Sequence, residues 1–202
     1  LLLLASAAAC GGNQSGGSSA TGAGNAGRTD VNYGLSSDIA SLDPVYTTDQ
    51  ISTILYRQLY DTLIVKGTDG SWQPKLAESW EVSDDEMVYT FHLRQDVKFH
   101  DGNGMTSEDV AYSVNRAIES AAVGASMTNM GECAALDDYT VELRMTQPFG
   151  GVMEILSTYG RVSSASTTDY ESAPIGTGPY KFVSRNSGDN ITLEAFPDYY
   201  LG

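Results

Sequence analysis

Apolar and polar residues alternate along one stretch of the chain, residues 88–94. Tyr89, Phe91 and Leu93 are separated from one another by polar residues. Successive side chains of a strand point to opposite faces, so this period of two predicts a strand with one buried face and one exposed face. His92 is then expected on the exposed face.

A spacing of three or four residues between apolar side chains predicts the helices of the chain. It is clearest over residues 49–63, where the apolar positions fall on one face. The same apolar spacing recurs over residues 106–120. At the start of this segment, Thr106 and Asp109 are three positions apart, as in a capping box. A third helix is expected over residues 149–159.

The remaining segments predict short strands joined by turns. Gly and Asp cluster repeatedly between residues 64 and 105. These residues favour turns, because Gly accepts positive φ angles and Asp bonds to nearby backbone groups, so this range predicts β structure with turns. We further expect a loop over residues 121–130, strands over 31–35 and 140–145, and a hairpin with strands at 180–183 and 191–195.

The first nine residues are mostly apolar and lead to Cys10. Such a run is far shorter than the roughly 20 residues that span a membrane, and we interpret residues 1–9 as the end of a signal peptide. Three alanines precede Cys10, which resembles the lipobox of bacterial lipoproteins, where the cysteine is diacylated. The Gly- and Ser-rich residues 10–29 would then be a lipoprotein tether. The alternative is an ordinary signal peptide whose cysteine has no role.

Charge is concentrated in residues 30–202. This part holds all 26 acidic residues and 10 of the 11 basic residues, which gives a formal charge of −16. So acidic a surface disfavours nucleic acid and anionic lipid as partners. Cys133 is the single cysteine of this part, so it is expected to be a small buried apolar residue rather than half of a disulfide.

No group of residues predicts catalysis. His92 and His100 are the only histidines of the chain, and they lack the short His and Cys spacings of a zinc site. The acidic residues 84–86 are interpreted as a solvated turn rather than as a general acid–base pair. We therefore expect a protein that is not an enzyme and that has no resident metal and no cofactor.

Polar groups suited to holding a small solute precede the predicted helix 49–63. Tyr46, Thr48, Asp49 and Gln50 combine an aromatic ring with hydrogen-bonding groups near a helix N-terminus. Solute sites use such aromatic walls with a few placed polar groups, and the helix dipole favours anions there. The alternative is an ordinary helix N-cap beside a tyrosine that packs.

Arg161 is a separate candidate for ligand binding. It follows a Tyr-Gly pair at the end of the predicted helix 149–159. A guanidinium group can hold a ligand carboxylate through two parallel hydrogen bonds. The alternative is a surface arginine with no role in binding.

Several motifs occur together in one order along the chain. Residues 74–110 contain PKLAESWEV, YTFHLR, VKFHDG and MTSEDV, in that sequence. An L-D-P precedes this block at residues 42–44, G-T-G-P-Y follows at 176–180, and P-D-Y-Y-L-G ends the chain at 197–202. Together they resemble the family 5 extracellular solute-binding proteins, the receptors of peptide- and nickel-type ABC importers.

The resemblance implies an α/β fold of the periplasmic-binding-protein type, a two-lobed clamp in the class that carries an extra subdomain. Residues 30–61 and 173–202 would be parts of lobe I, and residues 62–172 the inserted subdomain. Members of the family are much longer than this chain. We therefore expect only the N-terminal part of the clamp here, with lobe II absent.

The resemblance also implies a function. The expected role is a substrate-binding lipoprotein that captures oligopeptides or dipeptides and delivers them to a membrane permease. The alternatives are a nickel-chelate receptor of the same family and a surface signalling or adhesion lipoprotein that reuses the fold. The expected location is outside the cytoplasm, anchored to the membrane by lipid on Cys10, or periplasmic. In the family, the segment like 46–51 contacts ligand, and an arginine placed like Arg161 contacts the carboxylates of a metal chelate.

Overall fold

The computed structural model describes residues 31–202 of the chain. The predictions for residues 1–29, including the lipidation of Cys10, lie outside this range. Within it, no helix has the length and apolar character needed to cross a membrane. In chain order the elements are α1 (Gln50–Leu59), β1 (Ile64–Lys66), β2 (Trp72–Pro74), β3 (Ala77–Val82), β4 (Val88–Leu93), α2 (Ser107–Glu119), a 3₁₀ turn (Gly124–Ser126), β5 (Met130–Asp137), β6 (Thr140–Met145), α3 (Val152–Tyr159), β7 (Tyr180–Asn186) and β8 (Asn190–Ala195).

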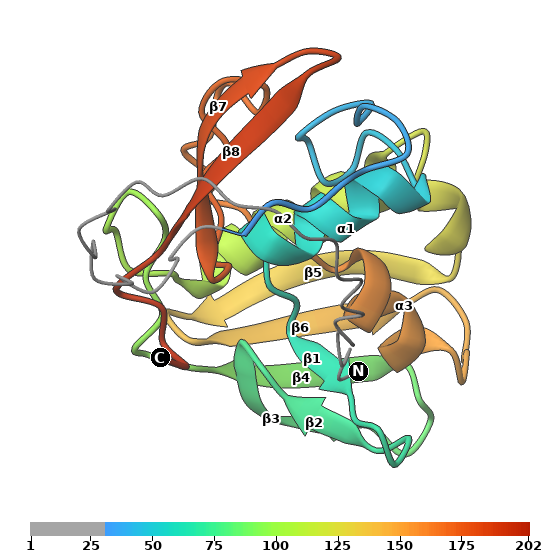
Figure 1. Cartoon of the computed structure of the whole chain (residues 1–202). Coiled ribbons are helices and arrows are strands. Elements are labelled where there is room, and N and C mark those ends of the chain that lie inside the picture. The colour runs from blue at the N-terminus through green and yellow to red at the C-terminus, as the bar shows by residue number, and fades with distance from the viewer. Residues whose placement is uncertain (1–30) are drawn as a thin grey trace, which may run out of the picture. The chain divides into compact units, whose positions relative to one another are not determined.

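A four-stranded antiparallel sheet with the strand order β3-β4-β6-β5 forms the centre of the structure (Figure 1). On β4 the side chains of Tyr89, Phe91 and Leu93 are buried in alternation, as the sequence predicts. In the register, Phe91 lies opposite Val141 and Tyr89 opposite Leu143 of β6. Cross-strand pairs of large apolar side chains stabilise such a sheet and set its register.

Two helices close the main core over this sheet. Helix α2 packs against β5 and β6, and α3 contacts β1. The predicted capping box of α2 is present, and Asp109 Oδ2 accepts a hydrogen bond from the backbone N–H of Thr106 at 3.0 Å. The core itself is filled by large fully buried side chains, among them Phe91, Phe99 and Leu143.

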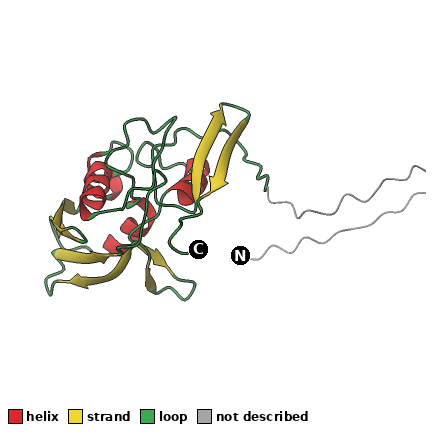
Figure 2. Cartoon of the chain, turned by 90° about the vertical axis from the view of Figure 1, so that its left-hand side faces the viewer, coloured by secondary structure: helices red, strands yellow, loops and turns green. Residues whose placement is uncertain are grey.

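A second, smaller core lies under helix α1. It consists of buried Ile39, Leu42, Tyr56, Leu59 and Tyr60, so both Tyr56 of α1 and Tyr60 at its C-cap are packed side chains. The β7–β8 hairpin supplies partly buried side chains to this core. The hairpin is its own two-stranded sheet and stands apart from the four-stranded sheet (Figure 2).

One predicted strand and one predicted helix end are wrong. Residues 31–35 are not a strand, because no described residue pairs with them. The helix predicted over residues 49–63 ends at Leu59, where Tyr60 turns to an extended conformation. Leu63 continues the helical spacing by coincidence: its side chain is buried in the main core, beside the start of β1.

The predicted loop over 121–130 and helix over 149–159 also need correction. Residues 124–126 form a 3₁₀ turn, and Met130 begins strand β5, which the sequence did not predict. Irregular register at two points of β5 breaks the alternation that would have identified it. Helix α3 starts at Val152, because Gly151 is its N-cap.

Candidate ligand-binding site

The segment before helix α1 is a rigid turn that presents an aromatic side chain. Asp43 forms this turn: its carbonyl oxygen accepts a hydrogen bond from Tyr46 N–H, and its Oδ1 accepts one from Val45 N–H, both at 3.1 Å. Beneath it, the hydroxyl of Tyr60 donates to Leu42 O at 3.0 Å. Tyr46 is left 64% exposed on this fixed support.

Asp49 is the N-cap of helix α1. Its Oδ1 accepts a hydrogen bond from the N–H of Ser52 at 2.8 Å, and its Oδ2 accepts one from Thr47 Oγ1 at 3.1 Å. Partial burial opposes these bonds, but they lower the pKa of Asp49 below its ordinary value. Asp49 therefore caps the helix, and its negative charge already lies at the positive end of the helix dipole. Thr48 and Gln50 are exposed on either side of it.

A hollow of about 430 Å³ lies beside Tyr46. On one side it is bounded by the Tyr46 turn and on the other by the C-terminal end of α2. The two sides are joined by the Ser120 hydroxyl, which donates to Val45 O at 2.6 Å. The lining residues are Asp43, Val45, Tyr46, Arg116, Glu119, Ser120, Ala121 and Ala122.

Arg116 fixes the geometry of this hollow. Its guanidinium forms a two-pronged ion pair with Asp43, with Nη1 at 2.8 Å from Oδ1 and Nη2 bonded to Oδ2. It also lies 4.3 Å from the ring centroid of Tyr170. Burial alone would lower the pKa of Arg116, but the bond to Asp43 raises it above its ordinary value. Because Asp43 and the ring of Tyr170 both contact the guanidinium of Arg116, this side chain positions the turn, and its charge is neutralised by Asp43.

Glu119 is the charged group of the hollow that remains without an ion-pair partner among residues 31–202. The sequence did not identify Glu119 or Arg116. Arg116 and Asp43 are 73 positions apart, and no local pattern relates them.

Arg161 lies elsewhere and is buried, so the surface-arginine alternative is wrong. It is 4% exposed, and its guanidinium lies 5.3 Å from the ring centroid of Tyr56 on α1. Burial lowers the pKa of Arg161 to about 10, helped by Arg57 and opposed by the two tyrosines Tyr56 and Tyr159. Among the described residues no carboxylate forms an ion pair with it, and it does not line the 430 Å³ hollow.

The structure brings four of the predicted residues together and leaves one apart. Tyr46, Thr48, Asp49 and Gln50 are exposed within one short segment, of which Tyr46 lines the hollow, whereas Arg161 is buried against Tyr56 of α1. Within residues 31–202, no three His, Cys, Asp or Glu side chains are close enough to hold a metal. Cys133 is buried, as predicted.

The chain matches the family described as bacterial extracellular solute-binding proteins, family 5 Middle, over residues 71–202. Among characterised relatives, it is 31% identical to the glutathione-binding protein GsiB of Pectobacterium atrosepticum over 180 residues. That alignment covers 85% of this chain and 35% of GsiB. The chain therefore spans about a third of the length of the relatives it matches.

Solved structures agree with this match. The binding protein AgaA of A. tumefaciens R10, in complex with agropinic acid, superposes with a TM-score of 0.72 at 32% identity, covering 80% of this chain and 34% of AgaA. DppA of Helicobacter pylori, in complex with the peptide STSA, gives 0.71 at 30% identity, covering 81% and 38%. The mixed α/β fold is thus part of a periplasmic-binding-protein structure, in a family of binding proteins rather than of enzymes. The chain belongs to the bacterial extracellular solute-binding proteins of family 5.

Proposed function

We propose that this chain supplies one wall of the ligand site in a receptor that captures small solutes for an ABC importer. The observation that carries the proposal is the mounting of Tyr46. A large aromatic residue is exposed on a turn that one ion pair and several hydrogen bonds hold in place, next to a hollow. Binding sites gain affinity when their aromatic and polar groups are fixed before the ligand arrives.

Tyr46, Thr48 and Gln50 are the proposed contacts with the solute. Their side chains are exposed, whereas Asp49 is engaged as the N-cap of α1. Arg161 has a different role in this proposal, because it is buried. Its charge is unpaired among the described carboxylates, so it favours an anionic group near α1 through space, since charges interact strongly where water is excluded.

The proposed solutes are short peptides and similar small molecules that carry a carboxylate. Three relatives support this class, since glutathione, the peptide STSA and agropinic acid all contain carboxylates. A nickel chelate, the alternative within the family, would also present carboxylates. Delivery to a membrane permease, the lipid anchor at Cys10 and a location outside the cytoplasm complete the proposal. The division into lobe I (30–61 and 173–202) and an inserted subdomain (62–172) remains part of it.

Calorimetric titration tests the proposal. The protein is expressed from its complete reading frame and titrated with glutathione, the tetrapeptide STSA, the same tetrapeptide with a C-terminal amide, and a nickel–histidine chelate. We expect at least one carboxylate-bearing probe to bind, and the amidated peptide to bind roughly tenfold more weakly than the free acid, a difference of about 1.4 kcal/mol. Absence of binding by all four probes would overturn the proposal.

Matched variants locate the site. Tyr46→Ala should weaken solute binding roughly tenfold, because aromatic anchors dominate such interfaces. The control Tyr180→Ala, at a tyrosine of β7 that is 41% exposed, should leave the solute affinity unchanged. Arg161→Met should reduce the preference for the free acid over the amide. Arg144→Met removes an exposed arginine of β6 and should preserve that preference.

A further inference from the structure

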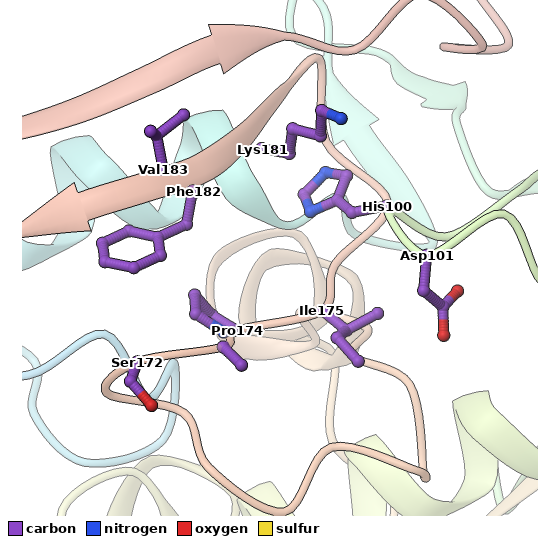
Figure 3. Close-up of a pocket in the computed structure, with 9 residues that line it drawn as sticks. His100, Asp101, Ser172, Pro174, Ile175, Lys181, Phe182 and Val183 are labelled. Carbon is purple, nitrogen blue, oxygen red and sulfur yellow. The ribbon is translucent and has the colours of Figure 1, made fainter.

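A second hollow, of about 250 Å³, lies where the loop after β4 meets the turn before β7. His100 and Asp101 line it from the loop, and Lys181 and Phe182 from β7 (Figure 3). The imidazole of His100 faces this junction, which is distant in sequence from the proposed ligand contacts. Neither the sequence patterns nor the proposed function gives His100 a role.

Both ring nitrogens of His100 are bonded to the backbone of one turn. Nδ1 accepts a hydrogen bond from the N–H of Gly176 at 3.2 Å, and Nε2 lies 3.0 Å from the carbonyl oxygen of Gly178. A carbonyl oxygen can only accept, so Nε2 carries the proton and Nδ1 does not. The backbone N–H of His100 also donates to Gly176 O at 3.0 Å. The geometry therefore selects one neutral tautomer of the ring.

The loop that carries His100 is itself rigid. Lys98 and Gly104 pair across it as an isolated antiparallel bridge, and Gly102 turns its tip with a φ of 89°. The ring of His100 meets the ring of Phe196 edge-on, with centroids 5.2 Å apart. His100 thus has little freedom to follow the turn if the turn moves.

The turn held by His100 joins parts of the chain that are far apart in sequence. Gly178 N–H donates to Leu59 O at the end of α1, and the Thr177 hydroxyl accepts from Asp61 N–H. Pro179 O accepts from Phe196 N–H at 2.9 Å, after β8. The His100 loop, α1 and the β7–β8 hairpin therefore meet at residues 176–179.

Charged groups approach His100 from three elements. Burial lowers the pKa of His100 below its ordinary value, and the positive charge of Lys181 on β7 lowers it further. The hydrogen bond to Gly178 O and the negative charges of Asp61 and Asp101 act in the opposite direction. Protonation would place a hydrogen on Nδ1, directly facing the N–H of Gly176. Two donors would then face each other, so that bond cannot survive in the charged state.

We propose that His100 is an acid-sensitive latch between the loop 97–104 and the turn 176–179. The latch is closed while the imidazole is neutral and opens when the ring is protonated. Because the charged form is disfavoured in the folded state, the latch stabilises the fold above the ordinary titration range of histidine, and this contribution is lost as the pH falls through the lowered value. Acidification then breaks the bond from Gly176 N–H to Nδ1 and loosens the His100 loop on the turn, while the bonds of the turn to α1 persist.

Nuclear magnetic resonance of the isotope-labelled 202-residue chain tests the latch without any substitution. Long-range ¹H–¹⁵N spectra should show His100 with the proton on Nε2 near neutral pH, and titration below the ordinary histidine range of about 6.5. The amide of Gly176 should lose hydrogen-exchange protection in the same pH range. The amide of Gly178, whose acceptor is a carbonyl of α1, is the internal control and should keep its protection.

Two matched variants separate the latch from general acid sensitivity. His100→Gln keeps a neutral donor and acceptor, so the fall in melting temperature between about pH 7 and about pH 5 should shrink by roughly half or more. His92→Gln alters the other histidine, which is on the exposed face of β4, and should retain the full fall. The proposal is overturned by the opposite tautomer, by titration above the ordinary range, by equal loss of protection at both glycines, or by a His100→Gln protein that keeps the full fall.

Discussion

Replacing Asp61, a carboxylate with no exposed surface, is predicted to destabilise the fold. Its Oδ2 accepts hydrogen bonds from the hydroxyls of Tyr199 and Tyr200 at 3.1 and 2.9 Å. The Lys75 ammonium lies 2.6 Å from Oδ1 as an ion pair, off the direction of an ideal hydrogen bond. Asp61 thereby holds the last residues of the chain to the end of α1. Asp61→Asn removes the charge and keeps the shape.

The expected cost follows from these partners. A hydrogen bond to a charged group contributes about 1 kcal/mol more than one between neutral groups, and Asp61 receives two from tyrosines. Lys75 is partly exposed, so it recovers part of its lost ion pair from water. The sum is a loss of about 3 kcal/mol in the free energy of unfolding, which corresponds to roughly 6–12 °C in melting temperature for a chain of this size.

Urea denaturation followed by circular dichroism measures this loss. The matched control is Asp198→Asn, which breaks an ion pair with Lys98 whose side chains are 50% and 57% exposed. Such exposed pairs contribute less than about 1 kcal/mol. Asp61 does not anchor the end of the chain if the unfolding free energy of Asp61→Asn stays within about 1 kcal/mol of the parent, or if the control destabilises the chain equally.

Three further predictions follow from single contacts. Gly176→Ala would place a Cβ 2.0 Å from a backbone oxygen of α1 and should lower the free energy of unfolding by about 2 kcal/mol in the same assay. The control Gly104→Ala meets no atom within 4 Å and should change the stability little. Equal effects of the two substitutions would contradict this packing. Burial raises the pKa of the Cys133 thiol to about 12, so in a Cys10→Ser background a thiol reagent should react only after denaturation, and reaction with the folded chain would be inconsistent with that burial. Backbone and side-chain hydrogen bonds from the β7–β8 turn and strand β7 lower the pKa of Asp38 from 3.8 to about 2. Its stabilising effect is therefore present above pH 3.8 and is lost as the pH falls towards 2. Asp38→Asn should flatten that part of the acid-denaturation curve, and an unchanged curve would contradict this prediction.

Elements that depend on local patterns were predictable. Strand β4 carries an unbroken alternation of apolar residues, and α2 begins with a capping box, so both follow from neighbouring residues alone. Strand β5 lacks such a signal because its register is irregular on both sides of Cys133. The end of α1 was misplaced because Leu63 continues the helical spacing although it packs in the main core instead.

The site could be predicted only where it depends on one segment. The exposure of Tyr46 and the capping by Asp49 arise within a few residues of sequence. The pairing of Arg116 with Asp43 depends on how α2 packs against a distant turn. The burial of Arg161 likewise depends on the position of α1 above it, which no pattern around the arginine reveals.

Hydrogen exchange measured by mass spectrometry, with and without a bound solute, locates the residues of this chain that contact the solute. The protein expressed from its complete reading frame is compared alone and saturated with whichever probe binds in the calorimetric titration. Added protection within this chain should concentrate at residues 43–50 and 116–122, the two sides of the hollow beside Tyr46. Protection confined to other parts of residues 31–202, with none at these two segments, would contradict this prediction.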